Sequence, residues 1–147
     1  MRTYFAQETD KDFIVASQLA MALETENLQL DANTVSQGVS HIFAHPEKGF
    51  YLIAKQDGVA IGTMLVLYEW SDWRNGEVLW IHSLFVVEKH RKQGVFKDFY
   101  LFLQNLVAEK SYKGIRLYVE KTNHNAQLAY QKMGMTKEHY ELYEWLK

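Results

Sequence analysis

The sequence predicts a mixed α/β fold (α+β), in which helices cover both faces of a mixed sheet. Three features predict it: a length of 147 residues, three strand-type segments separated by turn signals between residues 50 and 87, and alternating helix-type and strand-type segments from residue 95 onward. The sequence has no repeat and no Gly-, Ser- or Pro-rich linker, so we expect one domain over residues 1–147. The expected element order is βααβββαβαβ.

The first fifty residues are expected to form a short strand and two helices. Residues 3–7 have the composition of a strand, and Asp10 follows as the N-cap of a helix with apolar residues at helical spacing up to Leu23. Asp31 repeats this pattern, and Pro46 ends the second helix.

Three strands are expected next, as an antiparallel meander over residues 50–55, 59–70 and 77–87. Asp57 and Gly58 form a strong hairpin signal between the first two. Residues 71–76 turn the chain again. The third strand is mostly apolar, which predicts a central position in the sheet.

The remaining elements are expected to alternate. Apolar residues from Phe99 to Val107 recur at helical spacing, and residues 115–120 form the next strand. A helical crossover joins parallel strands, so the strands at 77–87 and 115–120 should lie parallel. Asn123 is the expected cap of a last helix that Gly134 ends, and residues 138–146 are the expected closing strand.

Composition excludes several classes of protein. The chain has 16 Lys and Arg against 18 Asp and Glu and no basic run, which argues against a nucleic-acid partner. It has no cysteine, no uncharged stretch of membrane-spanning length and a polar start, so we expect a cytoplasmic protein with no membrane partner. His41 and His45 stand four residues apart, but the six histidines form no metal signature, so no metal is expected.

The segment that carries chemistry follows the strand at 77–87. A short basic loop with Arg91 and Lys92 leads to Gly94 at the start of a helix. Helix N-termini offer unpaired amides to phosphate oxygens, and a glycine there allows a ligand to approach the backbone. The alternative is a solvated helix cap without a ligand.

A second cluster lies at the start of the last expected helix. Asn123, Ala126, Tyr130 and Gly134 follow one another there, with Tyr130 one helical turn beyond Ala126. Taken alone, Tyr130 could equally be core packing.

In this order and at this separation, the two clusters resemble the GNAT superfamily of acyl-CoA-dependent N-acyltransferases, from about residue 50 to the C-terminus. The loop pattern of that family is Arg/Gln-x-x-Gly-x-Gly/Ala. Arg91, Gly94 and Phe96 occupy the three positions, with Phe96 where a small residue is usual. The second cluster fits, with Met135 where Phe is usual.

The resemblance implies acetyl-CoA (coenzyme A) as co-substrate. Its pyrophosphate would lie on the amides of residues 93–96, and its pantetheine arm on the strand before them, where the two parallel strands splay apart with help from a bulge. The cofactor-binding residues that it implies are Phe85, Val86, Val87, Arg91, Lys92, Gln93, Gly94, Val95, Phe96, Asn123, Ala126 and Tyr130.

The resemblance also implies catalytic roles. Tyr130 would protonate the departing thiolate as a general acid. His82 has a pKa suited to removing the proton of the amine, and the alternative is a histidine buried between strands. Glu120 is the second candidate for the base.

The aromatic and acidic turn at residues 69–76 is the expected wall of an acceptor pocket. Carboxylates and tryptophan rings both bind ammonium groups. The expected acceptor-binding residues are Glu24, Glu69, Trp70, Asp72, Trp73 and Trp80. The alternative is a tight hairpin whose tryptophans cap the core or form a dimer contact.

Two functions follow from these residues. The first is an N-acetyltransferase that moves an acetyl group from acetyl-CoA directly to a primary amine of a small, cationic acceptor. Without cysteine, no thiol can carry a covalent acyl intermediate, which favours direct transfer. The second is a non-catalytic acyl-CoA-binding or interaction module on the same fold, which Phe96 would favour. The aromatic residues at 139–145 could support a homodimer.

Overall fold

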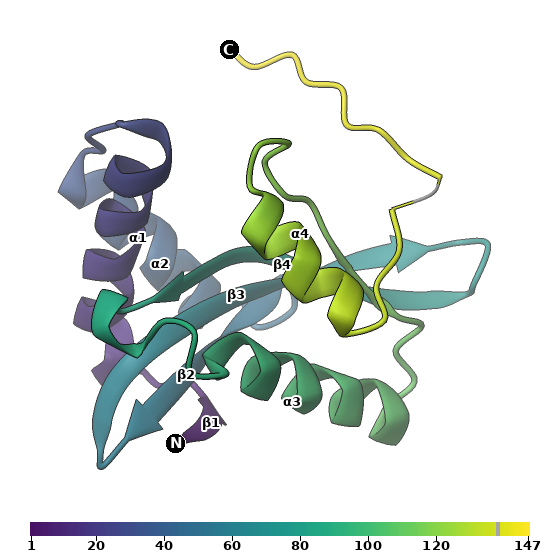
Figure 1. Cartoon of the computed structure of the whole chain (residues 1–147), viewed down its shortest axis with the longest axis horizontal. Coiled ribbons are helices and arrows are strands. Elements are labelled where there is room, and N and C mark those ends of the chain that lie inside the picture. The colour runs from purple at the N-terminus through teal and green to yellow at the C-terminus, as the bar shows by residue number, and fades with distance from the viewer. Residues whose placement is uncertain (138) are drawn as a thin grey trace. The chain divides into compact units, whose positions relative to one another are not determined.

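The computed structural model describes residues 1–137 and 139–147 (Figure 1). The chain divides into two compact units, Met1–Arg116 and Leu117–Lys147. The strands are β1 (Arg2–Phe5), β2 (Gly49–Gln56), β3 (Val59–Ser71), β4 (Gly76–Val86) and β5 (Ile115–Leu117). The helices are α1 (Lys11–Glu26), α2 (Ala32–Ala44), α3 (Val95–Glu109) and α4 (His124–Lys132), with short 3-10 turns at Glu8–Asp10 and Glu88–His90.

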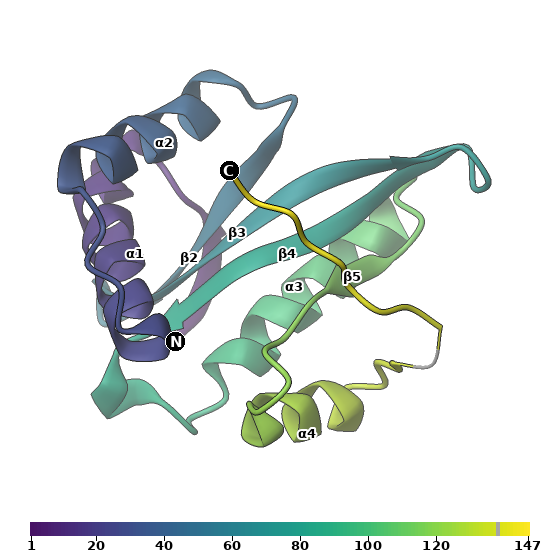
Figure 2. The same cartoon turned by 90° about the horizontal axis from the view of Figure 1, so that it is seen from above.

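The sheet confirms the predicted fold class. Its strand order is β1-β2-β3-β4-β5. The first four strands pair antiparallel, whereas β4 and β5 are parallel. Helices α1 and α2 lie on one face of the sheet and α3 on the other (Figure 2).

Local signals account for most of the boundaries. Asp57 and Gly58 both have positive φ, 51° and 80°, as the tight β2–β3 hairpin requires. Asp31 caps α2 by accepting a hydrogen bond from the Thr34 amide at 2.7 Å. Asp10 differs from the prediction: it precedes α1, but its carboxylate accepts from the Gln7 amide at 3.0 Å and pairs with Lys55 Nζ at 2.7 Å instead of capping the helix.

The two faces of the sheet hold separate parts of the core. On the α1 and α2 face, Ile14 and Val39 pack with Tyr51 and Leu65. On the other face, α3 buries Phe99 so closely that a Cβ added at Gly62 would come within 3.5 Å of its ring. This packing fixes α3, and therefore the loop that leads into it, against the sheet.

Two predicted strand segments differ in the structure. Strand β5 ends at Leu117 rather than at residue 120, because Glu120 already begins a turn by accepting a hydrogen bond from the Thr122 amide at 2.8 Å. The predicted closing strand is not present over residues 139–146, and Glu138 lies outside the described residues. Residues 139–146 join no strand ladder, and Tyr143 and Trp145 there are 89% and 90% exposed.

Within the described residues, no helix combines the length and the apolar character that a membrane crossing requires.

Candidate active site

A β-bulge interrupts strand β4 at His82. Leu65 of β3 stands opposite Ser83, but the next residue, Val66, stands opposite Ile81, so His82 is the extra residue of the bulge. The resemblance implied a bulge near this point, and the register places it at the candidate base. Two-residue alternation along a regular strand would place Trp80 and His82 on one face, and the bulge breaks this alternation at His82.

The bulge changes which edge of β4 each residue faces. The Leu79 amide donates to Gly114 O at 2.9 Å, toward β5, whereas the Val87 amide donates to Ile61 O at 2.9 Å, toward β3. In a trans peptide the C=O and the next N–H point in opposite directions. The Val86 carbonyl therefore faces away from β3, on the edge where the resemblance expects the pantetheine arm.

The loop after β4 leaves the start of α3 open. Lys92 and Gly94 have positive φ, 62° and 86°, on either side of Gln93, an alternation that turns successive amides toward one side. In the part of the chain that the structure describes, no side chain caps α3 at Gly94, and a Cβ built there meets nothing within 4 Å. The first amides of α3 therefore have the arrangement of an anion-binding site.

Phe96 does not close this helix start. Its ring packs beside that of Tyr100, one turn further along α3, with centroids 5.8 Å apart. The helix begins at Val95 as expected, and Val95 itself is buried. The bulky residue in the family pattern is accommodated along the helix rather than over the loop.

Arg91 and Gln93 hold the loop in place. Arg91 Nε donates to the Val86 carbonyl at 2.9 Å, and its terminal nitrogen donates to Glu24 of α1 at 2.6 Å. Gln93 Nε2 donates to the Lys89 carbonyl at 2.8 Å. Lys92 is exposed and adds a positive charge to the same loop.

His82 is on the surface of the bulge. Partial burial lowers its pKa below the ordinary value, so the neutral imidazole is the main form at pH 7. The adjacent Ser83 hydroxyl accepts a hydrogen bond from Gln18 Nε2 of α1 at 3.1 Å. Sequence analysis did not single out Gln18. A glutamine among the regularly spaced apolar residues of the first helix could have indicated a polar contact at the sheet.

The second unit holds the other predicted cluster. Asn123 caps α4 by accepting from the Ala126 amide at 3.1 Å. Tyr130 follows one turn after Ala126, and burial raises the pKa of its phenol above 10. The phenol therefore keeps its proton at neutral pH, as a general acid must.

Glu120 is less suited to the role of base. It accepts hydrogen bonds from the Thr122 amide and from the Thr122 hydroxyl, which lower its pKa. A carboxylate with a lowered pKa is a weaker base, and these bonds account for Glu120 as a turn-forming residue.

On the β3–β4 hairpin, Glu69 and the neighbouring Tyr68 contact β5 and the segment before it. Glu69 pairs with Arg116 at 2.9 Å, and Tyr68 stacks on Tyr112 with centroids 5.8 Å apart. Trp70 and Trp73 are 63% and 87% exposed, which contradicts the alternative in which the tryptophans of this hairpin cap the core. Asp72 accepts a hydrogen bond from the Trp73 amide at 2.9 Å, within the turn.

The structure does not bring all of the predicted acceptor residues together. The β3–β4 hairpin lies at the end of β4 that is far from α1 (Figures 1 and 2). Glu24 of α1 instead contacts Arg91, just beyond the other end of β4. A strand of this length spans about 33 Å at 3.3 Å per residue. Glu24 and Trp73 therefore cannot contact the same small amine, and Trp80 is the acceptor candidate nearest to His82 along β4.

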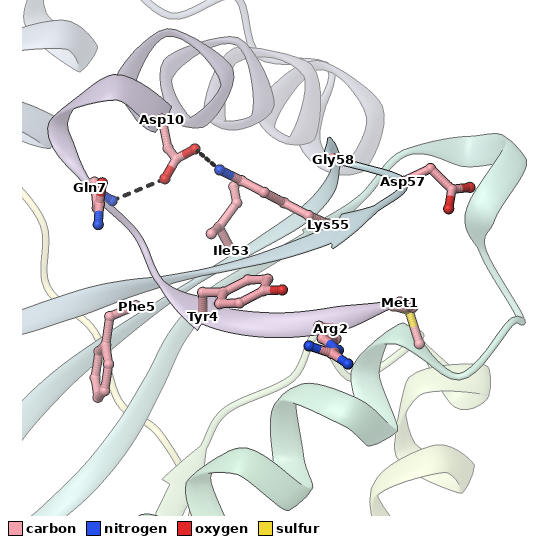
Figure 3. Close-up of a pocket in the computed structure, with 10 residues that line it drawn as sticks. All are labelled: Met1, Arg2, Tyr4, Phe5, Gln7, Asp10, Ile53, Lys55, Asp57 and Gly58. Atoms are coloured by element: carbon pink, nitrogen blue, oxygen red, sulfur yellow. Dashed lines mark hydrogen bonds and ion pairs between the residues drawn. The ribbon is translucent and has the colours of Figure 1, made fainter.

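A separate hollow of about 420 Å³ lies beside β1, at the β2–β3 turn (Figure 3). Its lining includes Tyr4, Phe5 and the Asp10–Lys55 ion pair. None of the predicted site residues lines it, so it gives no support to the predicted chemistry. Nowhere in residues 1–137 and 139–147 do three or more metal-binding side chains gather into a site.

Comparison with known proteins agrees with this architecture. The model of the acetyltransferase (GNAT) family matches residues 13–135. A crystal structure of a possible acetyltransferase from Clostridium difficile 630 is 33% identical, with a TM-score of 0.91, and the match covers 99% of this chain and 97% of that one. None of the curated proteins compared with the chain matches it.

More distant structures share the fold. A ribosomal-protein-alanine N-acetyltransferase from Brucella melitensis biovar Abortus 2308 has a TM-score of 0.77 at 12% identity, covering 98% of both chains. The aminoglycoside N-acetyltransferase AAC(6')-Iy, in complex with CoA, has a TM-score of 0.78 at 16% identity, covering 99% of this chain and 93% of that one. The family match over residues 13–135 and the 33% identical structure define an acetyltransferase. The chain belongs to the acetyltransferase (GNAT) family and is a GNAT-type N-acetyltransferase.

Proposed function

We propose that the protein transfers an acetyl group from acetyl-CoA directly to a primary amine of a small acceptor. The observation that carries the proposal is the uncapped start of α3 at Gly94, which directly follows the bulged strand β4. Among structural relatives, AAC(6')-Iy is in complex with CoA, which supports coenzyme A as the source of the anion.

The residues of the loop fit a diphosphate. The amides at the start of α3 supply hydrogen-bond donors, and the positive end of the helix dipole faces the same place. Lys92 and Arg91 add two positive charges to this loop. The edge of β4 that the Val86 carbonyl faces offers main-chain groups to an extended pantetheine arm, with the Val86 oxygen itself also bonded to Arg91.

His82 is our proposed base and Tyr130 our proposed acid. An ammonium group must lose a proton before its nitrogen attacks the thioester carbon, and a neutral imidazole accepts that proton. As the C–S bond breaks, the electron pair goes to sulfur, and a neutral phenol supplies the proton that forms the thiol. The lowered pKa of His82 and the raised pKa of Tyr130 both favour the protonation states that these roles need.

The acceptor is proposed to lie near His82, with Trp80 as one wall. Glu24 and Glu69, which were predicted to attract a cation, are already paired with arginines. The cationic character of the acceptor therefore rests on the relationship to aminoglycoside N-acetyltransferases rather than on these two carboxylates.

The binding-module alternative relied on Phe96. Phe96 packs on Tyr100, and a Cβ at Gly94 meets nothing within 4 Å, so the bulk of Phe96 is no reason to prefer a binding module over an enzyme.

The test has two stages. Calorimetric titration with acetyl-CoA should give saturable 1:1 binding, and a thiol-release assay with a panel of primary amines should then identify an acceptor. Binding without thiol release from any amine would favour a binding module. No binding at millimolar acetyl-CoA would remove the transferase proposal altogether.

A further inference from the structure

The Arg91 guanidinium is held in one orientation by three contacts from two different elements. Its Nε donates to Val86 O at 2.9 Å, and its terminal nitrogen donates to Glu24 Oε2 at 2.6 Å. Its central carbon also lies 5.9 Å from the centroid of the Phe85 ring. A planar fork bonded at two points cannot rotate freely, so the side chain is fixed before any ligand arrives.

Fixing the guanidinium leaves it able to bind an anion. The group has five N–H donors, and the two hydrogen bonds to Val86 and Glu24 use two of them. The Arg91 side chain is 41% exposed, so the remaining donors can be reached from solvent. A lysine could not reproduce this arrangement, because its ammonium group has no rigid fork.

We infer that Glu24 is a positioning residue for acetyl-CoA binding, which acts by fixing Arg91 beside the diphosphate-binding loop. This inference rests on the proposed function and assigns Glu24 to the cofactor side, whereas sequence analysis placed it on the acceptor side. Glu24 lies 67 positions from Arg91 in sequence, in the last two turns of α1, so the pair also ties that helix to the loop. Preorganisation of this kind strengthens binding because less side-chain freedom is lost when the ligand binds.

If Glu24 positions Arg91, removing its side chain should weaken acetyl-CoA binding. Simple charge repulsion predicts the opposite result. A carboxylate near a diphosphate site repels the ligand, so removing its charge alone should tighten binding. Removing the contact that fixes Arg91 should weaken binding instead. Glu26 is the matched control, because it lies in the same exposed end of α1 and has no place in the proposed machinery.

The experiment compares acetyl-CoA binding by calorimetry in wild type, Glu24→Ala, Glu24→Gln, Glu26→Ala and Arg91→Lys. We expect Glu24→Ala and Arg91→Lys each to weaken binding about fivefold, the upper value for an exposed ion pair. Glu24→Gln keeps a hydrogen-bond acceptor and should stay within about twofold of wild type, while Glu26→Ala should bind equally or slightly more tightly. The Glu24→Ala, Arg91→Lys double variant should be no weaker than either single variant.

Binding by Glu24→Ala that equals or exceeds wild type would overturn the inference, as would a raised acceptor KM with unchanged acetyl-CoA binding. Thermal unfolding of each variant checks that the protein is folded. If wild type itself fails to bind acetyl-CoA, the proposed function fails and the inference with it. If wild type binds and Glu24→Ala binds equally, the inference alone fails.

Discussion

Replacement of Gly94 by alanine tests the proposed diphosphate site at the position where the backbone conformation least tolerates a side chain. Gly94 has φ +86°, a conformation that costs an L-residue about 1–2 kcal/mol. Because a Cβ there meets no atom within 4 Å, the change adds backbone strain without a steric clash. In a chain of this size, we expect the melting temperature to fall by about 2–8 °C.

The effect on binding should be larger than the strain alone explains. A methyl group at Gly94 projects where the backbone would meet the diphosphate, so at least one charge-assisted hydrogen bond is lost. Such a bond contributes about 1.5–3 kcal/mol, which corresponds to a loss of about 10- to 150-fold in acetyl-CoA affinity. Calorimetric titration measures this loss directly.

Gly58→Ala is the matched control. Gly58 has φ +80° in the β2–β3 hairpin, and a Cβ there also meets nothing within 4 Å. Both variants should lose similar stability, but only Gly94→Ala should lose affinity. Equal affinity in the two variants would refute the assignment of the loop as the diphosphate site.

Three further predictions concern catalysis and the acceptor. Tyr130→Phe should lower kcat about 100-fold or more, the range for loss of a general acid, with acetyl-CoA affinity unchanged; an unchanged kcat would exclude Tyr130 as the acid. The neutral base form of His82 gains population as pH rises, so kcat/KM should increase with pH and reach a plateau; because the pKa of His82 is lowered, the midpoint of this rise should lie below the ordinary histidine value of about 6.5. The rising limb should be absent in His82→Gln, and its persistence would assign the base elsewhere. Trp73→Ala should leave the acceptor KM within about twofold, since β4 spans about 20 Å between His82 and Gly76, which ends the turn that holds Trp73; a tenfold rise would contradict that placement.

The local parts of the fold could be predicted because their causes lie within a few residues. Asp57-Gly58 adopts the two positive φ angles of a tight hairpin, Asp31 caps α2, and Gly94 precedes α3. Each of these signals depends on backbone conformation or on a hydrogen bond between near neighbours. The residue pattern of the loop likewise predicted the family to which the chain belongs.

Contacts across long sequence separations could not be predicted in the same way. Asp10 pairs with Lys55 rather than capping α1. Glu69 pairs with Arg116 rather than being available to a cationic acceptor. These pairs depend on strand register and helix placement, which no local pattern specifies. The missing strand at residues 139–146 has the same cause, because a strand needs a neighbour as well as a suitable sequence.

The sequence by itself determined the order of elements as far as α4, the turn conformations and the family, since all of these arise from residue type and short spacing. Tertiary structure alone decided the bulge at His82, the Glu24–Arg91 pair and the separation of the hairpin from the end of β4. The physical reason is that strand register and strand length set how far apart two residues of the chain lie in space. Residues assigned to one pocket by chemistry can therefore stand at opposite ends of a strand.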